Sequence, residues 1–319
     1  MLGLFDAKNR KLFRFILALA CSIAALWVLW NDRVNISANL LSLPDLAAYH
    51  PLPSLLFLTL SVINLSLEAF RWKILLSAAI PSIAYRQALA SVLAGYATGF
   101  FSPNRLGEII GRLCFFKKEH MAAMLALQAS GGFAQLAVSL LAGSICNILL
   151  TFLYPTKLPY LLDLLLPYCL IAGILFTLAF RYPEQILKAL HQFIPLRFKP
   201  LLSLFKNRTN RFVWLLSLIR FMVYSFQLMM LLHLFWPEFT YSGLFLFAGF
   251  YFLVVSVVPS FAITEAGIKG AVGIGLFMLV FNRVGSPFSV CALTLWIVNV
   301  CIPALTGIYF ILKSGEDAL

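Results

Sequence analysis

The chain has 319 residues, of which 62% are hydrophobic and 11% are charged, with a formal net charge of +12. Because soluble domains carry about 25% charged residues, this composition excludes a soluble globular protein and predicts a membrane protein with several spans. Excess Lys and Arg in such a protein marks the cytoplasmic side and contacts anionic lipid, so the charge does not indicate a nucleic-acid partner.

A membrane-spanning helix needs about 20 mostly apolar residues. In chain order, the hydropathy pattern predicts full spans at residues 12–30, 52–70, 121–150, 161–180, 212–236 and 288–312. The first of these runs follows a basic segment and resembles a signal peptide. No small-residue cleavage site follows Trp30, however, so we interpret the run as a retained first helix.

Two further apolar stretches, residues 87–116 and 243–282, are each interrupted by a polar break. They share an Ala-Gly-aromatic triplet, then a proline, then a Glu with a basic residue four positions later. The first has Ala94-Gly95-Tyr96, Pro103, Glu108 and Arg112, and the second has Ala248-Gly249-Phe250, Pro259, Glu265 and Lys269. Paired, interrupted membrane segments in corresponding halves of a chain indicate a transport site.

Basic residues outside the predicted membrane segments orient the spans. If both interrupted stretches return to the face they entered from, seventeen basic residues fall on one side and three, Arg33, Lys157 and Arg283, on the other. This asymmetry predicts that both termini are cytoplasmic. The two stretches then have opposite orientations, as in an inverted repeat with halves at residues 1–180 and 212–312 and a basic cytoplasmic loop at 181–211.

The predicted fold is therefore an all-α polytopic membrane domain covering residues 1–319, with about six full spans and two broken or re-entrant helical hairpins. The alternative is that stretch 243–282 forms two complete spans, which gives eight spans in all. The count of basic residues does not distinguish the two arrangements of stretch 243–282, because in both of them the stretch begins and ends on the outer side.

Charged residues inside the predicted membrane segments are the candidate substrate-binding residues. Each costs roughly 2.5–3.5 kcal/mol at the centre of a spanning helix, so a retained charge indicates function or a partner. The set consists of Arg105, Glu108, Arg112, Arg220, Glu265 and Lys269. Glu108 with Arg112, and Glu265 with Lys269, have the four-residue spacing of a helical ion pair. The alternative is that Arg105, Arg112 and Lys269 lie at the interface and reach lipid phosphates.

Residues around the two breaks are expected to support this site. Ser102 before Pro103, and Thr264 before Glu265, suit helix N-termini, whose free N–H groups attract an anionic phosphate. The supporting set is Arg71, Pro103, Asn104, Gly107, Pro259 and Thr264. We interpret Glu68, Arg71 and Lys73 as an interfacial charge cluster, with Trp72 in the aromatic belt.

Other polar residues have simpler interpretations. Gln128, Gln135 and Gln227 are predicted to join helices by hydrogen bonds, with substrate contact as the alternative, and the Gly273–Gly275 pair indicates close helix packing. The histidines are dispersed, the cysteines lack metal spacing, and no nucleotide-binding loop follows a strand. We therefore expect no metal, no cofactor and no catalytic residue.

The run Glu68-Ala69-Phe70-Arg71-Trp72, followed by Pro103, Arg105, Gly107, Glu108 and Arg112, resembles the lysylphosphatidylglycerol synthase transmembrane-region family, also described as flippase-like membrane proteins. Pro259 and Glu265 fit a later motif of that family, but Phe261, Ala262 and Ile263 stand where glycines are common. The resemblance implies movement of anionic lipids or polyprenyl-linked glycans across a bacterial-type cytoplasmic membrane. The aminoacyl-transferase domain of the best-known branch is not in this sequence, so lipid aminoacylation is not expected.

The sequence thus predicts a lipid translocase whose partners are membrane lipids, with the headgroup held by intramembrane Arg and Lys. One alternative is an intramembrane transferase that acts on lipid substrates and uses Glu108 or Glu265 as a base. Another is a non-transporting scaffold that recruits a cytoplasmic or membrane enzyme through the loop at 181–211.

Overall fold

The computed structural model describes residues 27, 30, 33–100, 107–116, 120–154, 160–190, 204–258 and 262–316. These residues form helices and no strand. Five helices are long and apolar enough to cross a membrane: Pro51–Leu76, Met121–Leu153, Asp163–Arg181, Asn207–Phe235 and Pro287–Leu312. The prediction of an all-α polytopic membrane protein is confirmed, and these helices coincide with five of the predicted spans. The first predicted span, 12–30, lies outside the described residues except for Trp27 and Trp30.

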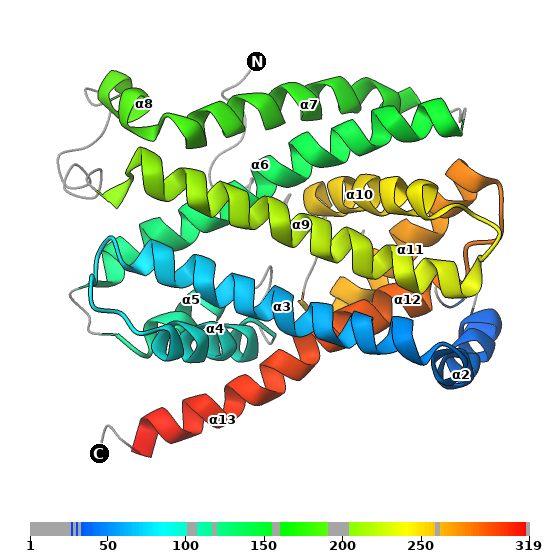
Figure 1. Cartoon of the computed structure of the whole chain (residues 1–319), viewed down its shortest axis with the longest axis horizontal. Coiled ribbons are helices and arrows are strands. Elements are labelled where there is room, and N and C mark those ends of the chain that lie inside the picture. The colour runs from blue at the N-terminus through cyan, green and yellow to red at the C-terminus, as the bar shows by residue number, and fades with distance from the viewer. Residues whose placement is uncertain are drawn as a thin grey trace.

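Figure 1 shows how the helices are arranged. In chain order they are α2 (Arg33–Tyr49), α3 (Pro51–Leu76), α4 (Tyr85–Phe100), α5 (Gly107–Leu113), α6 (Met121–Leu153), α7 (Tyr160–Arg181), α8 (Pro183–Leu190), α9 (Asn207–Phe235), α10 (Tyr241–Val257), α11 (Ala262–Phe281), α12 (Pro287–Trp296) and α13 (Ile302–Glu316). A π-helical turn, Ile297–Cys301, joins α12 to α13. Helix α2 follows the first predicted span and was not expected from the hydropathy pattern.

The first interrupted stretch forms a tight hairpin of α4 and α5. Helix α4 has 16 residues and α5 has 7, so α4 is about 24 Å long, short of the roughly 30 Å hydrocarbon core. The Thr98 hydroxyl donates a hydrogen bond of 2.6 Å to the Gly107 carbonyl across the hairpin. A Cβ atom at Gly111 of α5 would overlap the carbonyl oxygen of Ala94 on α4, so only glycine allows this approach. The predicted broken hairpin at 87–116 is present, with its break at residues 101–106 outside the described part.

The second interrupted stretch forms a more open hairpin of α10 and α11. Their 17 and 20 residues correspond to about 25 and 30 Å of helix, so α10 is shorter than a full span and α11 is about as long as one. Helix α10 packs mainly on α6 and α9, and α11 packs mainly on α12. The two hairpins extend from opposite ends of the molecule (Figure 1), as expected for segments of opposite orientation.

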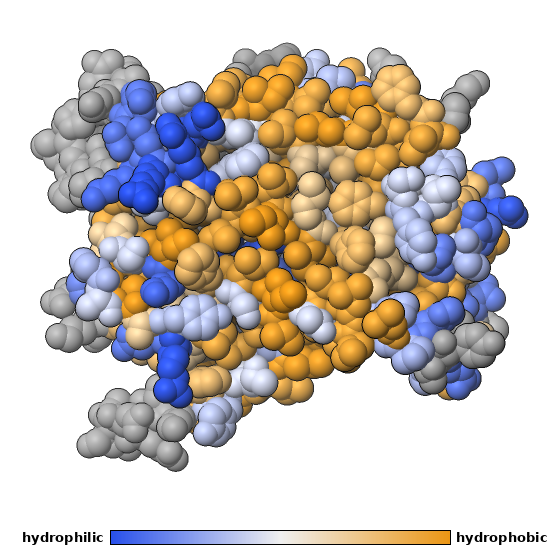
Figure 2. Space-filling view, viewed as in Figure 1, coloured by the Kyte–Doolittle hydropathy of each residue, from blue (hydrophilic) through white to orange (hydrophobic). Residues whose placement is uncertain are grey.

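Two buried apolar clusters hold the helices together. One contains Trp72, Leu76 and Leu127 beside the first hairpin, and the other contains Phe247 and Phe277 beside the second. The face shown in Figure 2 is largely apolar over the middle of the molecule, and hydrophilic residues gather towards its two ends. This distribution is the one expected for a protein whose middle is surrounded by hydrocarbon.

The predicted loop at 181–211 is shorter than expected. It contains α8, and α9 already begins at Asn207. The backbone N–H of Asn207 donates to Glu184 Oε1 at 3.1 Å, which ties α8 to the start of α9. Residues 191–203 lie outside the described part of the chain.

The Gly273–Gly275 pair provides a test of helix packing. A Cβ atom at Gly273 would overlap the Phe288 ring on α12, whereas one at Gly275 would meet no atom within 4 Å. We expect Gly273→Ala to lower the free energy of unfolding by about 1–3 kcal/mol through overpacking. Gly275→Ala should be neutral or slightly stabilising, since Ala is about 1 kcal/mol better than Gly within a helix. Melting temperatures of the two purified variants in detergent check this, and equal values would contradict the packing described.

Candidate functional site

The carboxylate of Glu68 on α3 is the centre of the site. It is 3% exposed and contacts three guanidinium groups. Arg71 lies 2.6 Å from Glu68 Oε2, and Arg112 of α5 lies 2.7 Å from Glu68 Oε1. Arg220 of α9 donates a hydrogen bond to Glu68 Oε2. One carboxylate therefore connects α3, the short arm of the first hairpin, and α9.

Arg71 is held from two further helices. Its Nη1 donates to the Ser217 hydroxyl on α9 at 2.9 Å and to the Gly131 carbonyl on α6 at 3.2 Å. A longer contact of 3.4 Å reaches Gln135 Oε1, also on α6. Because it is paired with Glu68 and held by these contacts, Arg71 is fixed in place rather than free to extend towards a membrane surface.

Arg112 has two carboxylate neighbours and an aromatic one. The predicted partner, Glu108, lies 3.7 Å away, but Glu68 lies 1 Å closer, at 2.7 Å. The guanidinium also lies over the Trp72 ring, 5.1 Å from its centroid, a cation–π geometry. Trp72 Nε1 in turn donates to the Ser91 hydroxyl on α4 at 2.7 Å. The spacing of Glu108 and Arg112 therefore identified a real pair but missed the closer partner.

A chain of amide groups continues from Arg220. Its Nε donates to Asn64 Oδ1 at 3.1 Å, and Asn64 Nδ2 donates to Asn299 Oδ1 at 3.0 Å. Asn299 lies in the π-helical turn and donates to Gln227 Oε1 at 3.4 Å, while Gln227 donates to Ser61 at 2.6 Å. The prediction that glutamines join helices is confirmed for Gln227 and Gln135, and it is wrong for Gln128, whose side chain makes no hydrogen bond with the described residues. Single π turns inside helices are frequent at functional sites.

The second hairpin carries its own ion pair. Lys269 Nζ lies 2.5 Å from Glu265 Oε1, as the four-residue spacing predicted. The Lys269 side chain is 26% exposed, against 10% for Glu265. The Tyr251 hydroxyl donates to the Lys269 carbonyl at 3.2 Å, which connects α10 to α11 at this level.

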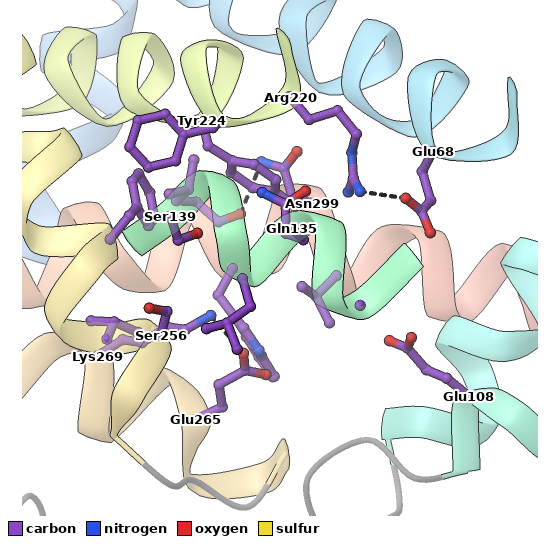
Figure 3. Close-up of a pocket in the computed structure, with 18 of the residues that line it drawn as sticks. Glu68, Glu108, Gln135, Ser139, Arg220, Tyr224, Ser256, Glu265, Lys269 and Asn299 are labelled. Carbon is purple, nitrogen blue, oxygen red and sulfur yellow. Dashed lines mark hydrogen bonds and ion pairs between the residues drawn. The ribbon is translucent and has the colours of Figure 1, made fainter. Parts of the chain in front are cut away.

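The charged residues around Glu68 and the Glu265–Lys269 pair line one cavity of about 460 Å³ (Figure 3). Its described charged lining consists of Glu68, Arg71, Glu108, Arg112, Arg220, Glu265 and Lys269. Four of these are basic and three acidic, so the described lining has one basic residue in excess. Tyr251 of one buried apolar cluster and Tyr96 of the other also line the cavity. The cavity thus brings residues of both hairpins together inside the helix bundle.

The predicted site residues fall into two groups. Those that meet at the cavity are Glu108, Arg112, Arg220, Glu265, Lys269 and the supporting Arg71. Gly107 begins α5 next to them. Pro103, Asn104, Arg105 and Pro259 lie outside the described residues, as does the side chain of Thr264.

Two interfacial interpretations are wrong. Glu68, Arg71 and Trp72 are 3%, 7% and 1% exposed, so they are buried among helices instead of lying in a surface charge cluster and an aromatic belt. Arg112 is 4% exposed and paired with Glu68, so it is not a lipid-facing anchor. Burial by tertiary packing, which hydropathy does not register, accounts for both differences.

The sequence analysis missed Glu68, Asn64 and Asn299 as site residues. A signal existed for Glu68, because a carboxylate within an apolar run three residues before Arg71 already has the spacing of a helical pair. The two asparagines are isolated amides in apolar segments and give no comparable pattern.

No protein-family model matches the chain, and no curated protein matches it. The family resemblance inferred from the motifs therefore stays a prediction. Fold and site together define a polytopic α-helical membrane protein with a buried, charged cavity.

Glu68→Gln tests the central role of this carboxylate. It would leave three buried guanidiniums without their shared counter-ion, and breaking a buried pair in this way costs about 3–5 kcal/mol. We expect a large drop in melting temperature in detergent, or little folded protein. Glu108→Gln is the matched control, because Arg112 keeps its closer contact with Glu68. If both variants melt at the wild-type temperature, Glu68 does not organise the site.

Proposed function

We propose that this chain is a lipid translocator that moves the headgroup of an anionic phospholipid or a polyprenyl-linked glycan across the membrane without changing it chemically. The observation that carries this proposal is the cavity lined by Arg71, Arg112, Arg220 and Lys269 inside an apolar helix bundle. Such charges are expensive within a membrane and mark substrate pathways.

The chemistry of the lining supports an anionic headgroup. Guanidinium groups bind phosphate by paired, charge-assisted hydrogen bonds, and a lysine binds it as a point charge. Each guanidinium has five N–H donors, so Arg112 and Arg220 keep donors beyond those directed at Glu68. A phosphate in the cavity therefore finds donors that are not directed at Glu68, competes with Glu68 for the positive charge of Arg112, and neutralises the basic excess of the lining.

The outside of the bundle supports a lipid as the carrier of that headgroup. Apolar side chains cover the middle of the molecule (Figure 2), and exposed ones include Leu58, Val62, Phe133 and Leu175. Acyl chains stay in the bilayer against this surface while the polar head passes through the cavity. No water-filled path for the tails is needed.

The two hairpins supply the moving parts in this mechanism. They extend from opposite ends of the molecule and each brings charged residues to the cavity, Arg112 from α5 and Lys269 from α11. Outward and inward exposure alternate as one hairpin and then the other moves against the rest of the bundle. Glu68, Glu108 and Glu265 hold the cations when no headgroup is bound.

A bacterial-type cytoplasmic membrane with cytoplasmic termini is part of the proposal. The end of α3, the junction of α8 with α9, and the end of α13 lie at the same end of the molecule (Figure 1). Lys73, Arg86 and Arg181 belong to helix ends on that side, whereas Arg33 begins α2 and Arg283 follows the end of α11 on the other. This distribution supports the orientation given by the positive-inside rule.

A cavity-filling substitution tests transport without removing a structural charge. Gly132 lines the cavity, and a Cβ atom there would meet no atom within 4 Å. We expect Gly132→Leu to fold and to lower the transport rate at least about tenfold, equivalent to about 1.4 kcal/mol of lost headgroup binding. The measurement is loss of fluorescence on adding dithionite to proteoliposomes that contain acyl-labelled phosphatidylglycerol, with and without an imposed proton gradient.

Gly275→Leu is the matched control. It also adds a side chain into open space, but Gly275 is not among the residues that line the cavity. Its transport rate should equal that of the wild type. Wild-type protein that moves no labelled anionic lipid under either condition would contradict the proposed function, as would a Gly132→Leu variant that transports normally.

A further inference from the structure

The cavity lining also contains a neutral polar region beside its charged residues. In Figure 3, Gln135 and Asn299 lie between the Glu265–Lys269 pair and the side of the cavity that holds Glu68 and Glu108, and Ser139 and Tyr224 lie above that pair. Gln128 and Trp296 line the same cavity. Phosphate recognition by the basic residues does not use this region. Cavities that hold small-molecule groups measure about 300–1,000 Å³, so a volume of about 460 Å³ has room for more than a phosphate.

Several polar groups in this lining have no protein partner. Trp296 Nε1 and Arg112 Nε are buried donors that make no hydrogen bond with any described residue. Within the same described part of the chain, Gln128 and Ser139 make no side-chain hydrogen bond either. Buried donors without a partner are rare in native proteins, and two of those in the described residues, Trp296 Nε1 and Arg112 Nε, belong to residues that line this cavity, which favours a polar ligand there.

Helix α6 presents these groups in a row. Gln128, Gly132, Gln135 and Ser139 are spaced by four, three and four residues, which places them on one face of the helix. All four line the cavity, and Gly132 leaves open space between its polar neighbours. The row therefore offers amide and hydroxyl groups along a surface long enough for several contacts with one ligand.

The chemistry of the region fits a polyhydroxylated ring. Hydroxyl groups donate and accept hydrogen bonds, as amide and hydroxyl side chains do, and an indole N–H donates to a hydroxyl oxygen. Tyr224, Tyr251 and Trp296 add aromatic faces to the same lining. An amino headgroup fits less well, because it needs a carboxylate, and Glu68, Glu108 and Glu265 are already paired with cations of the protein.

We propose that the neutral region is a subsite for a sugar or another ring polyol linked through phosphate to a lipid. The phosphate lies against Arg112 and Arg220, while Gln128, Ser139 and Trp296 contact the ring hydroxyls. This inference deepens the proposed function and rests on it. With this subsite, the protein selects lipids by the hydroxyl groups of the headgroup and not by negative charge alone.

Proteoliposomes containing the full chain test this selectivity with two acyl-labelled probes. Phosphatidylinositol carries a phosphodiester and an inositol ring whose other hydroxyl groups are free, whereas phosphatidic acid carries phosphate alone. We expect the wild type to move the inositol lipid faster. Trp296→Phe and Gln128→Leu should each lower the ratio of the two rates about three- to tenfold, the effect of losing one or two neutral hydrogen bonds.

Trp296→Phe separates a ligand contact from a structural one. It keeps a ring against Phe100, whose centroid lies 5.5 Å from that of Trp296, and removes only a donor with no described protein partner. Its melting temperature without added lipid should therefore not fall. Trp214→Phe is the control, because Trp214 Nε1 donates to Thr177 at 3.3 Å outside the cavity. Its rate ratio should equal that of the wild type.

The outcomes separate the subsite from the proposed function. Equal wild-type rates for the two lipids, or an unchanged ratio in both cavity variants, overturn the subsite and leave transport standing. If neither lipid is transported, the proposed function fails, and melting temperatures then decide on the subsite. The inositol lipid must raise the wild-type melting temperature more than phosphatidic acid does, and Trp296→Phe must remove that difference; any other result overturns the subsite.

Discussion

Three guanidinium groups on α3, α5 and α9 converge on one buried carboxylate, that of Glu68. Moving such ions out of water costs several kcal/mol each, and the cost is offset only if every charge finds close partners. A single carboxylate cannot neutralise three cations. The cluster is therefore stable only with further support, from Ser217 and Gly131 for Arg71, Trp72 for Arg112 and Asn64 for Arg220. These contacts fix the helices that surround the cavity.

The ion pair of Glu265 and Lys269 differs from the cluster around Glu68. Glu265 and Lys269 are neighbours on one helix, largely balance each other, and leave Lys269 about a quarter exposed towards the cavity. The two sides of the cavity are thus unequal: one is basic and rigidly held, and the other is close to neutral. A headgroup that moves between them exchanges strong phosphate contacts for weak ones. Under the proposed function, this difference favours release at the second hairpin.

The features that could be predicted from the sequence are those that depend on composition or on residues close together in the chain. Composition identified the membrane class, and four-residue spacing identified the pair of Glu265 and Lys269. The contacts of Glu68 with Arg112 and Arg220 join residues 44 and 152 positions apart, and no local pattern encodes them. The π-helical turn that places Asn299 was likewise beyond prediction, because it depends on the packing of neighbouring helices. Hydropathy placed Arg71 and Trp72 at the membrane interface, but the structure buries both side chains among helices.

The size of α5 connects ligand binding to movement of the hairpin. A helix of seven residues is not stable alone, because forming its first turn is unfavourable and few hydrogen bonds follow. Helix α5 is held instead by its close packing on α4 and by the contact of Arg112 with Glu68. An anion that binds Arg112 competes with the second of these. Under the proposed function, headgroup binding therefore weakens one of the two attachments of α5 to the bundle, at the place where a moving element is required.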